Sequence, residues 1–207
     1  MLIDISPPID STIAVWPGDT PFARNVSVDL AKGDHLTLSD VHTTLHVGAH
    51  TDAPSHYIAG GEDIGVRSLH YYLGACVVVH VPDARGRRIM PADLSGKRIT
   101  AARVLIATGT FPDPRAWNED FASLSPELVD WLHDRGVITI GIDTPSVDPF
   151  ESKALEAHQA MAAHDMANLE GLVLDRAAEG MYELIALPLR INGADASPVR
   201  AVLRTIA

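Results

Sequence analysis

Alternating and continuous apolar runs predict a chain built mainly from short strands. Residues 2–5 and 13–16 are short apolar segments separated by a Pro-rich turn, and both are predicted as strands. Apolar and polar residues then alternate over 24–30 and 35–47, which is typical of strands with one exposed face. We expect this first part of the chain to form an antiparallel meander.

The later apolar runs are continuous, which indicates strands that are buried on both faces. They occupy 75–81, 103–108 and 137–142, and 184–187 and 199–206 predict two more strands. Between them, Ser125 precedes Pro126 and an apolar stripe that ends before Gly136, which predicts a capped helix. A second helix is predicted around 154–164 and a short one after Pro91, whereas 110–124 has the composition of a loop.

This order of elements predicts an α/β fold, with helices packed on a mixed sheet and more strand than helix. The strand, helix and strand between 103 and 142 favour parallel pairing through a right-handed crossover. With 207 residues and 46% hydrophobic content, the chain is expected to form a single domain over 1–207.

Charge and cysteine content limit the possible partners and the expected compartment. The formal net charge of −11 argues against a nucleic-acid partner. No apolar segment has the length of a membrane span, so no membrane contact is expected. The single cysteine, Cys76, begins an apolar run and is expected to be a small buried side chain in a protein of the reducing cytoplasm.

Candidate chemistry is concentrated between His46 and His56, a stretch that reads His-Val-Gly-Ala-His-Thr-Asp-Ala-Pro-Ser-His. On a straight strand His46 and His50 would lie roughly 13 Å apart, too far to share one metal ion. Gly48 and Pro54 also disfavour a helix. We therefore predict a strand that ends near Val47 and a turn at Gly48 that brings His50 and Asp52 back toward His46. Imidazole and carboxylate groups suit zinc, manganese or iron; the alternative is a histidine-rich surface loop.

A second group of candidate ligands follows about a hundred residues later. His158 lies in the predicted helix, and Glu170 stands between two apolar residues, where a buried carboxylate needs a partner. Five candidate ligands are enough for two bridged metal ions, or for one ion with spare groups. His56 is left over and suits general acid/base chemistry. A packed or exposed histidine is the alternative for His158, and a Pro-stiffened turn is the alternative for the loop 143–148.

Four motifs together resemble those of the bacterial kynurenine formamidases, which are metal-dependent members of the cyclase-like hydrolases. The motifs are Trp16-Pro-Gly-Asp19, His46 to His56, Asp143-Thr-Pro-Ser-Val-Asp148, and His158 with Asn168-Leu-Glu170. The resemblance covers almost the whole chain in the family's order. One departure is Ala49, where the family commonly has threonine.

The resemblance implies a swivelling β/β/α domain, usually in a homodimer, with zinc as the usual metal and two ions per subunit, although manganese would also fit. It implies that His46, His50 and Asp52 bind one ion, and that Asp52 and Glu170 bridge to a second ion completed by His158. His56 would then exchange protons, and Trp16, which spacing alone leaves as either core or pocket wall, would contact an aromatic substrate.

The activity implied is hydrolysis of N-formyl-L-kynurenine to L-kynurenine and formate, a step of tryptophan degradation. Two alternatives remain open at this point. One is a hydrolase of the same fold acting on another N-acyl or cyclic amide, such as isatin. The other is a metal-binding or ligand-binding protein without turnover, against which the surplus His56 argues.

Overall fold

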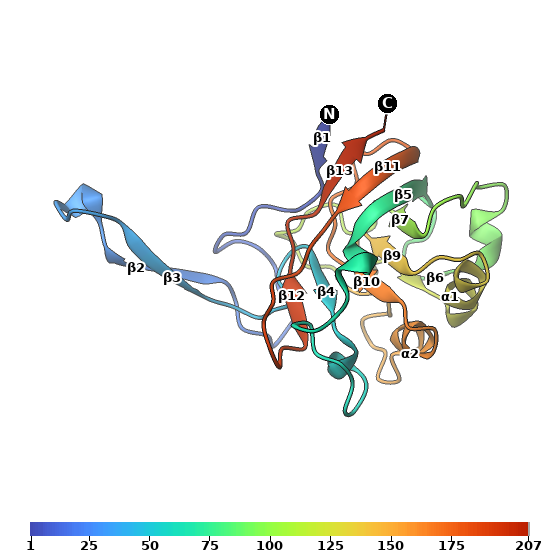
Figure 1. Cartoon of the computed structure of the whole chain (residues 1–207), viewed down its shortest axis with the longest axis horizontal. Coiled ribbons are helices and arrows are strands. Elements are labelled where there is room, and N and C mark those ends of the chain that lie inside the picture. Colours follow the sequence, from blue (N-terminus) through green and yellow to red (C-terminus); the bar gives the residue numbers. More distant parts are fainter. Residues whose placement is uncertain (207) are drawn as a thin grey trace.

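The computed structural model describes residues 1–206, which form a body of three layers and one long arm (Figure 1). A large mixed sheet is the central layer. Two helices cover one of its faces, and a small two-stranded sheet with its loops covers the other. The helices of the described residues are all too short to cross a membrane.

The large sheet has seven strands in the order β1-β13-β11-β5-β7-β9-β10. The bounds of these strands, in chain order, are β1 Leu2–Asp4, β5 Leu73–His80, β7 Arg103–Ala107, β9 Thr139–Ile142, β10 Ala167–Leu169, β11 Gly180–Ile185 and β13 Val202–Thr205. The half from β5 to β10 is parallel, whereas β1, β13, β11 and β5 pair antiparallel. The prediction of a mixed sheet with parallel pairing between 103 and 142 is confirmed.

Three further pairs of strands stand outside the large sheet. They are β2 Ala23–Val28 with β3 Leu38–His42, β4 His50–Asp52 with β12 Ala196–Pro198, and β6 Arg88–Ile89 with β8 Ser123–Leu124. Sequence patterns did not predict β4, β6, β8, β10 or β12, because runs of two or three residues show no periodicity.

Alternate residues of the central strands feed two separate cores. In β5, Val77 and Val79 pack toward the helices, whereas Cys76 and Val78 pack toward the small sheet. This explains why the strand reads as a continuous apolar run. Cys76 is fully buried, as expected, and burial raises the pKa of its thiol to about 12.

The two helices begin in different ways. In α1 (Pro126–His133), the Ser125 hydroxyl accepts a hydrogen bond from the amide of Leu128, as its sequence predicts. In α2 (Glu156–Ala163), residue Leu155 offers no such cap, and the carboxylate of Asp148 instead accepts bonds from the first-turn amides of Ala157 and His158. The start of α2 is therefore set by a side chain outside the helix.

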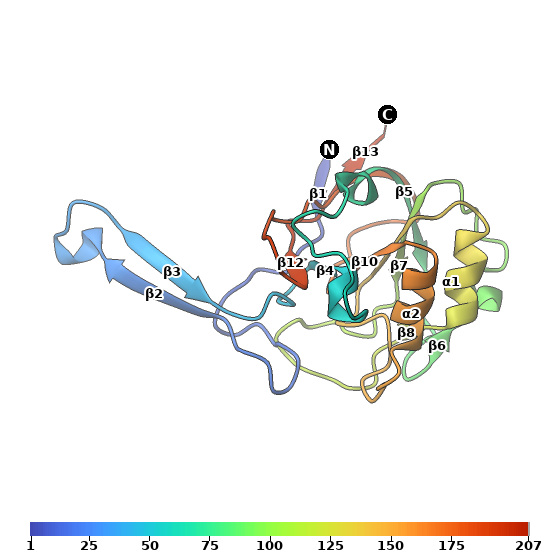
Figure 2. The same ribbon diagram turned by 60° about the horizontal axis from the view of Figure 1, so that its bottom comes forward.

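The arm is the hairpin of β2 and β3, which extends away from the body in both views (Figure 2). Every residue of β3 is exposed, including Leu38 and Val41. Where the arm joins the body, just outside the two strands, the amide of Thr44 donates a hydrogen bond to the carbonyl of Thr20.

Three sequence predictions in this region are wrong. In place of the expected antiparallel meander there are two separate pairings, β1 with β13 and β2 with β3. Residues 13–16 form an irregular segment instead of a strand, since the amide of Ala14 donates to the carbonyl of Pro114 in a distant loop. The predicted strand over 35–47 is only the five-residue β3, because the chain leaves the arm and bends through 45–49 before β4 begins at His50. The turn at Gly48 is present, with a positive φ of 62°.

Candidate metal centre

A cavity of about 820 Å³ opens on the face of the large sheet that carries the small sheet. All seven predicted site residues line it: Trp16, His46, His50, Asp52, His56, His158 and Glu170. They come from the N-terminal segment, the bend before β4, β4 itself, the turn after it, α2, and the end of β10. The fold thus brings both halves of the predicted site together.

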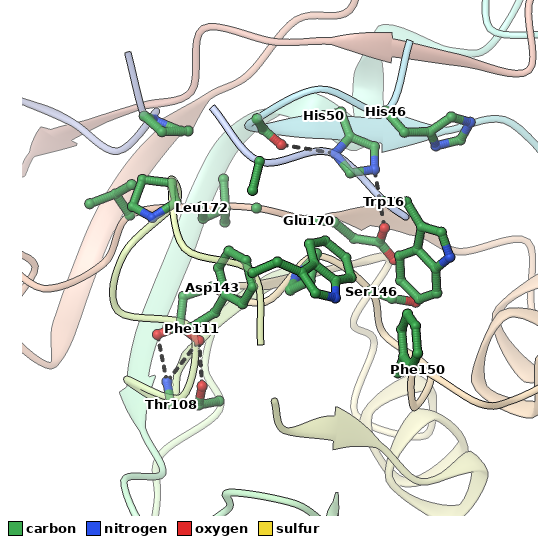
Figure 3. Close-up of a pocket in the computed structure, with 18 of the residues that line it drawn as sticks. Trp16, His46, His50, Thr108, Phe111, Asp143, Ser146, Phe150, Glu170 and Leu172 are labelled. Carbon is green, nitrogen blue, oxygen red and sulfur yellow. Dashed lines mark hydrogen bonds and ion pairs between the residues drawn. The ribbon is translucent and has the colours of Figure 1, made fainter. Parts of the chain in front are cut away.

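Backbone hydrogen bonds join the two halves directly. The amide of His50 donates to the carbonyl of Glu170, and the amide of Glu170 donates to the carbonyl of His50, at 3.1 and 2.9 Å. Since His50 and Asp52 are two apart on β4, their side chains point to the same face of the strand. The His50 and Glu170 side chains meet with His50 Nε2 at 3.2 Å from Glu170 Oε2 (Figure 3).

Asp52 lies at the centre of the cluster and is almost fully buried. Its Oδ1 lies 2.9 Å from His46 Nδ1 and 3.6 Å from His50 Nε2, and its Oδ2 lies 3.2 Å from His158 Nε2. Glu170 Oε1 lies 3.3 Å from the same His158 nitrogen. Both carboxylates therefore lie between histidines.

The charges of these groups compensate one another. Burial would lower the pKa of His46, but contact with Asp52 and Asp195 raises it to about 9. Burial would likewise lower the pKa of His158, but Asp148, Asp52 and Glu170 raise it well above its usual value. Burial would raise the pKa of Asp52, whereas the surrounding histidines hold it well below its usual range. The raised pKa values of His46 and His158 favour their positively charged forms, which offset the negative charge of the buried carboxylates.

This arrangement fits a divalent metal ion. Despite its short distance to His46, Asp52 Oδ1 has no aligned hydrogen-bond donor within residues 1–206, although it is buried. Buried carboxylate oxygens normally have a partner, and a cation between the imidazole and carboxylate atoms would supply one. His50, Asp52 and Glu170 place one ligand atom each within 4.8 Å of one another, and so do His46, Asp52 and His56.

His56 lies on the rim of the cluster. Pro54 begins the short helical turn that carries His56, and the side chain of His56 is 34% exposed. Its ring centroid is 4.3 Å from that of His46, and its Nδ1 lies 3.4 Å from Asp195 Oδ2. Its position suits either a proton carrier or a further ligand.

Aromatic side chains form one wall of the cavity, near the cluster of histidines and carboxylates. The ring centroid of Trp16 lies 5.1 Å from that of Phe150 and 5.2 Å from that of Trp117. Figure 3 shows Trp16 below His46, with Phe150 below Trp16. Sequence reasoning pointed to Trp16 but missed Phe150, and it left Trp117 as part of an exposed loop. A pocket of this kind suits a planar apolar group.

The loop 143–148 supports the cluster without supplying a ligand. The Asp143 carboxylate turns away from the histidines and accepts bonds from the amides of Thr108 and Gly109 and from the Thr108 hydroxyl (Figure 3). Burial raises the pKa of Asp143. At the other end of the loop, the amide of Val147 donates to Glu170 Oε1, and Asp148 Oδ2 lies 2.9 Å from His158 Nδ1.

Two other supporting residues were missed. The side-chain amide of Asn168 donates to Asp52 Oδ2 and Glu170 Oε1, and its oxygen accepts from the amide of Asp52. The alternation of Asn168 and Glu170 on one strand could have suggested this. Asp195 Oδ2 lies 3.0 Å from His46 Nε2, but it stands alone after a Gly-Ala turn, and nothing near it in sequence points to the site. Ala49, which stands where the family commonly has threonine, is buried next to His50.

Comparison with protein families and known proteins finds similarity over most of the chain. Residues 3–149 match the family model "Cyclase", described as "Putative cyclase". Kynurenine formamidase of Bordetella pertussis is 45% identical over 207 residues, covering 100% of this chain and 99% of that protein. Kynurenine formamidase of Bordetella petrii is 44% identical over 206 residues, covering 99% and 98%.

Solved structures share the fold at lower sequence identity. A potential metal-dependent hydrolase with cyclase activity superposes with a TM-score of 0.84 at 24% identity, over 98% of this chain and 96% of that one. Isatin hydrolase A from Labrenzia aggregata gives a TM-score of 0.81 at 20% identity, over 98% and 93%. These likenesses confirm the expected α/β fold class.

Proposed function

Since the chain belongs to the cyclase family, we propose that it is a metal-dependent kynurenine formamidase, which hydrolyses N-formyl-L-kynurenine to L-kynurenine and formate. The observation that carries the proposal is the buried cluster of histidines and carboxylates, which opens into an aromatic-walled cavity in a chain 45% identical to such enzymes. The cluster supplies a place for the hydrolytic chemistry, and the wall supplies a place for the aryl ring.

We propose that His46, His50 and Asp52 would hold one ion, and that Asp52, Glu170 and His158 would hold a second. The absence of a thiolate and the mixture of imidazole and carboxylate donors suit zinc, with manganese as the alternative. When bound, a divalent ion polarises the amide carbonyl and lowers the pKa of water toward neutrality. Asn168 and Val147 hold the two carboxylates in place with N–H donors.

His56 is proposed to move the proton that amide cleavage requires. Addition of water to the formyl carbon and cleavage of the C–N bond leave an aryl amine, which must gain a proton. With Nδ1 directed toward Asp195, the Nε2 atom of His56 is free to take a proton from the attacking water and return it to the leaving nitrogen.

The aromatic wall is proposed to orient the substrate. The indole of Trp16, which contacts Phe150 and Trp117, offers an aromatic surface on which the kynurenine ring can pack. Packing the ring there would place the ortho formamide group toward His56 and the metal ligands, because these groups line the same cavity.

Kynurenine release, followed by its absorbance, tests the function. The purified protein is incubated with N-formyl-L-kynurenine, with isatin in a parallel sample, and each is repeated after treatment with a chelator. We expect kynurenine release that the chelator abolishes and added zinc or manganese restores. Release that survives metal removal would refute metal dependence, and turnover of isatin alone would assign the protein to another amide.

We also propose that the protein is a cytoplasmic homodimer whose arm binds a second copy. A two-stranded hairpin is marginally stable in water by itself, yet this one exposes Leu30, Leu36, Leu38 and Val41. Light scattering should give twice the chain mass, and replacing Leu38 and Val41 with serine and threonine should give monomers. A monomeric wild-type protein would refute this proposal.

A further inference from the structure

Each of the three proposed ligand histidines is held from both sides. One ring nitrogen faces Asp52 or Glu170, and the other lies within hydrogen-bonding distance of an outer oxygen. The outer oxygens are the Gly48 carbonyl for His50 at 2.9 Å, Asp148 for His158 at 2.9 Å, and Asp195 for His46 at 3.0 Å. Such outer contacts fix which nitrogen of an imidazole is available to a metal.

Asp195 differs from the other two because one of its atoms contacts two histidines. The same Oδ2 lies 3.0 Å from His46 Nε2 and 3.4 Å from His56 Nδ1, and the two rings lie next to each other. Asp148 and Gly48 contact only one histidine ring each among the contacts of residues 1–206.

The backbone holds Asp195 firmly although its side chain is 48% exposed. Its carbonyl accepts a hydrogen bond from the amide of Ala53, 2.8 Å away. The next residue, Ala196, pairs with Asp52 across β12 and β4. Asp195 is therefore fixed relative to the strand that carries the ligands and to the turn that carries His56.

We propose that Asp195 is a positioning residue that orients His46 and His56 together. By accepting from His46 Nε2 it leaves Nδ1 for the metal, and by accepting from His56 Nδ1 it leaves Nε2 for proton transfer. The part that concerns His56 rests on the proposed function; the part that concerns His46 requires only a metal site. One carboxylate would thus couple metal binding to the orientation of the proton carrier.

Zinc affinity and steady-state kinetics of Asp195→Asn test this inference. An asparagine keeps the size of the side chain but has no negative charge, so its single oxygen would accept hydrogen bonds from the two rings more weakly than the carboxylate does. We expect zinc affinity, measured by competition with a chromophoric chelator, to fall about 10-fold or more. At saturating zinc, kcat should fall about 10–100-fold while KM changes much less, because the aromatic wall is intact.

Two further variants separate positioning from general effects. Asp195→Glu keeps the carboxylate and should recover part of both losses. Asp83→Asn removes one negative charge from an exposed residue outside the metal cluster and should leave both quantities at their wild-type values. Thermal unfolding in chelator shows whether a variant keeps the fold. If Asp195→Asn is destabilised, Asp195→Glu is compared with the wild type instead. A fall in both zinc affinity and kcat in Asp195→Glu would support the positioning role, and a change in neither quantity would contradict it.

Wild-type zinc affinity and kcat in Asp195→Asn would overturn the inference. Equal losses in Asp83→Asn would also overturn it, because net charge would then explain the effect. If the wild-type protein releases no kynurenine, the proposed function fails, but the zinc measurements still test whether Asp195 orients His46.

Discussion

Gly171→Ala should damage the metal centre through the backbone alone. Gly171 follows Glu170 directly and has a φ of 63°, a conformation that costs an L-residue about 1–2 kcal/mol. A Cβ there would meet the carbonyl oxygen of Gly48 and lie 2.9 Å from its carbonyl carbon. That carbonyl oxygen is 2.9 Å from His50 Nδ1, so the backbone that must move also orients a proposed ligand.

The expected loss of stability in Gly171→Ala is the sum of these two costs. Forcing backbone apart in a packed interior costs about 1–3 kcal/mol, so with the conformational cost we expect about 2–5 kcal/mol in total. For a chain of this length each kcal/mol lowers the melting temperature by about 2–4 °C. Zinc affinity should also fall, by about 10-fold, as for other losses of an outer contact.

Gly136→Ala is the matched control. Gly136 has a φ of 78°, and a Cβ there meets no atom within 4 Å, so only the conformational cost applies. Melting of the metal-free proteins and zinc competition should therefore separate the two variants. If Gly171→Ala melts with Gly136→Ala and binds zinc like the wild type, the contact with Gly48 does not position His50.

Three more predictions concern the side chains themselves. His56→Ala should keep its metal, measured by elemental analysis, and lose about 10²-fold or more in kcat; loss of metal would make His56 a ligand. Asp52→Ala should lose both metal and activity, because Asp52 lies between three of the proposed ligands; an active variant with full metal content would refute the two-ion bridge. Trp16→Ala should raise KM for N-formyl-L-kynurenine about 10-fold with little change in metal content, since it removes an aromatic contact; an unchanged KM would exclude Trp16 from the substrate site.

The sequence predicted the central strands well because their chemistry is strong and local. The run beginning at Cys76 and the capped helix after Ser125 carry their own signals, and both elements form where expected. The strand predicted over 13–16 failed because that segment bonds to a loop a hundred residues away. Local pattern contains no record of such a partner.

The candidate site divides in the same way. The density of histidines identified His46, His50 and Asp52, and a buried carboxylate between apolar residues identified Glu170. Asp195 and Phe150 could not be predicted from the sequence. A lone aspartate and a lone phenylalanine show no pattern, and they belong to the site only because the fold places them against His46 and Trp16. The turn at Gly48 was found, but the strand before it ends at His42 and not near Val47, and the short strand β4 after the turn was not predicted.

The arm has a consequence for how such proteins can diversify. Its strands leave and rejoin the body at one point, where Thr20 and Thr44 are hydrogen-bonded, so its length can change without moving the ends it connects. Insertions or deletions between these residues would leave the layers of the body and the ligand positions unaltered. Changes in the arm could therefore alter which molecules the protein binds through it, while the cluster of histidines and carboxylates in the body stays the same.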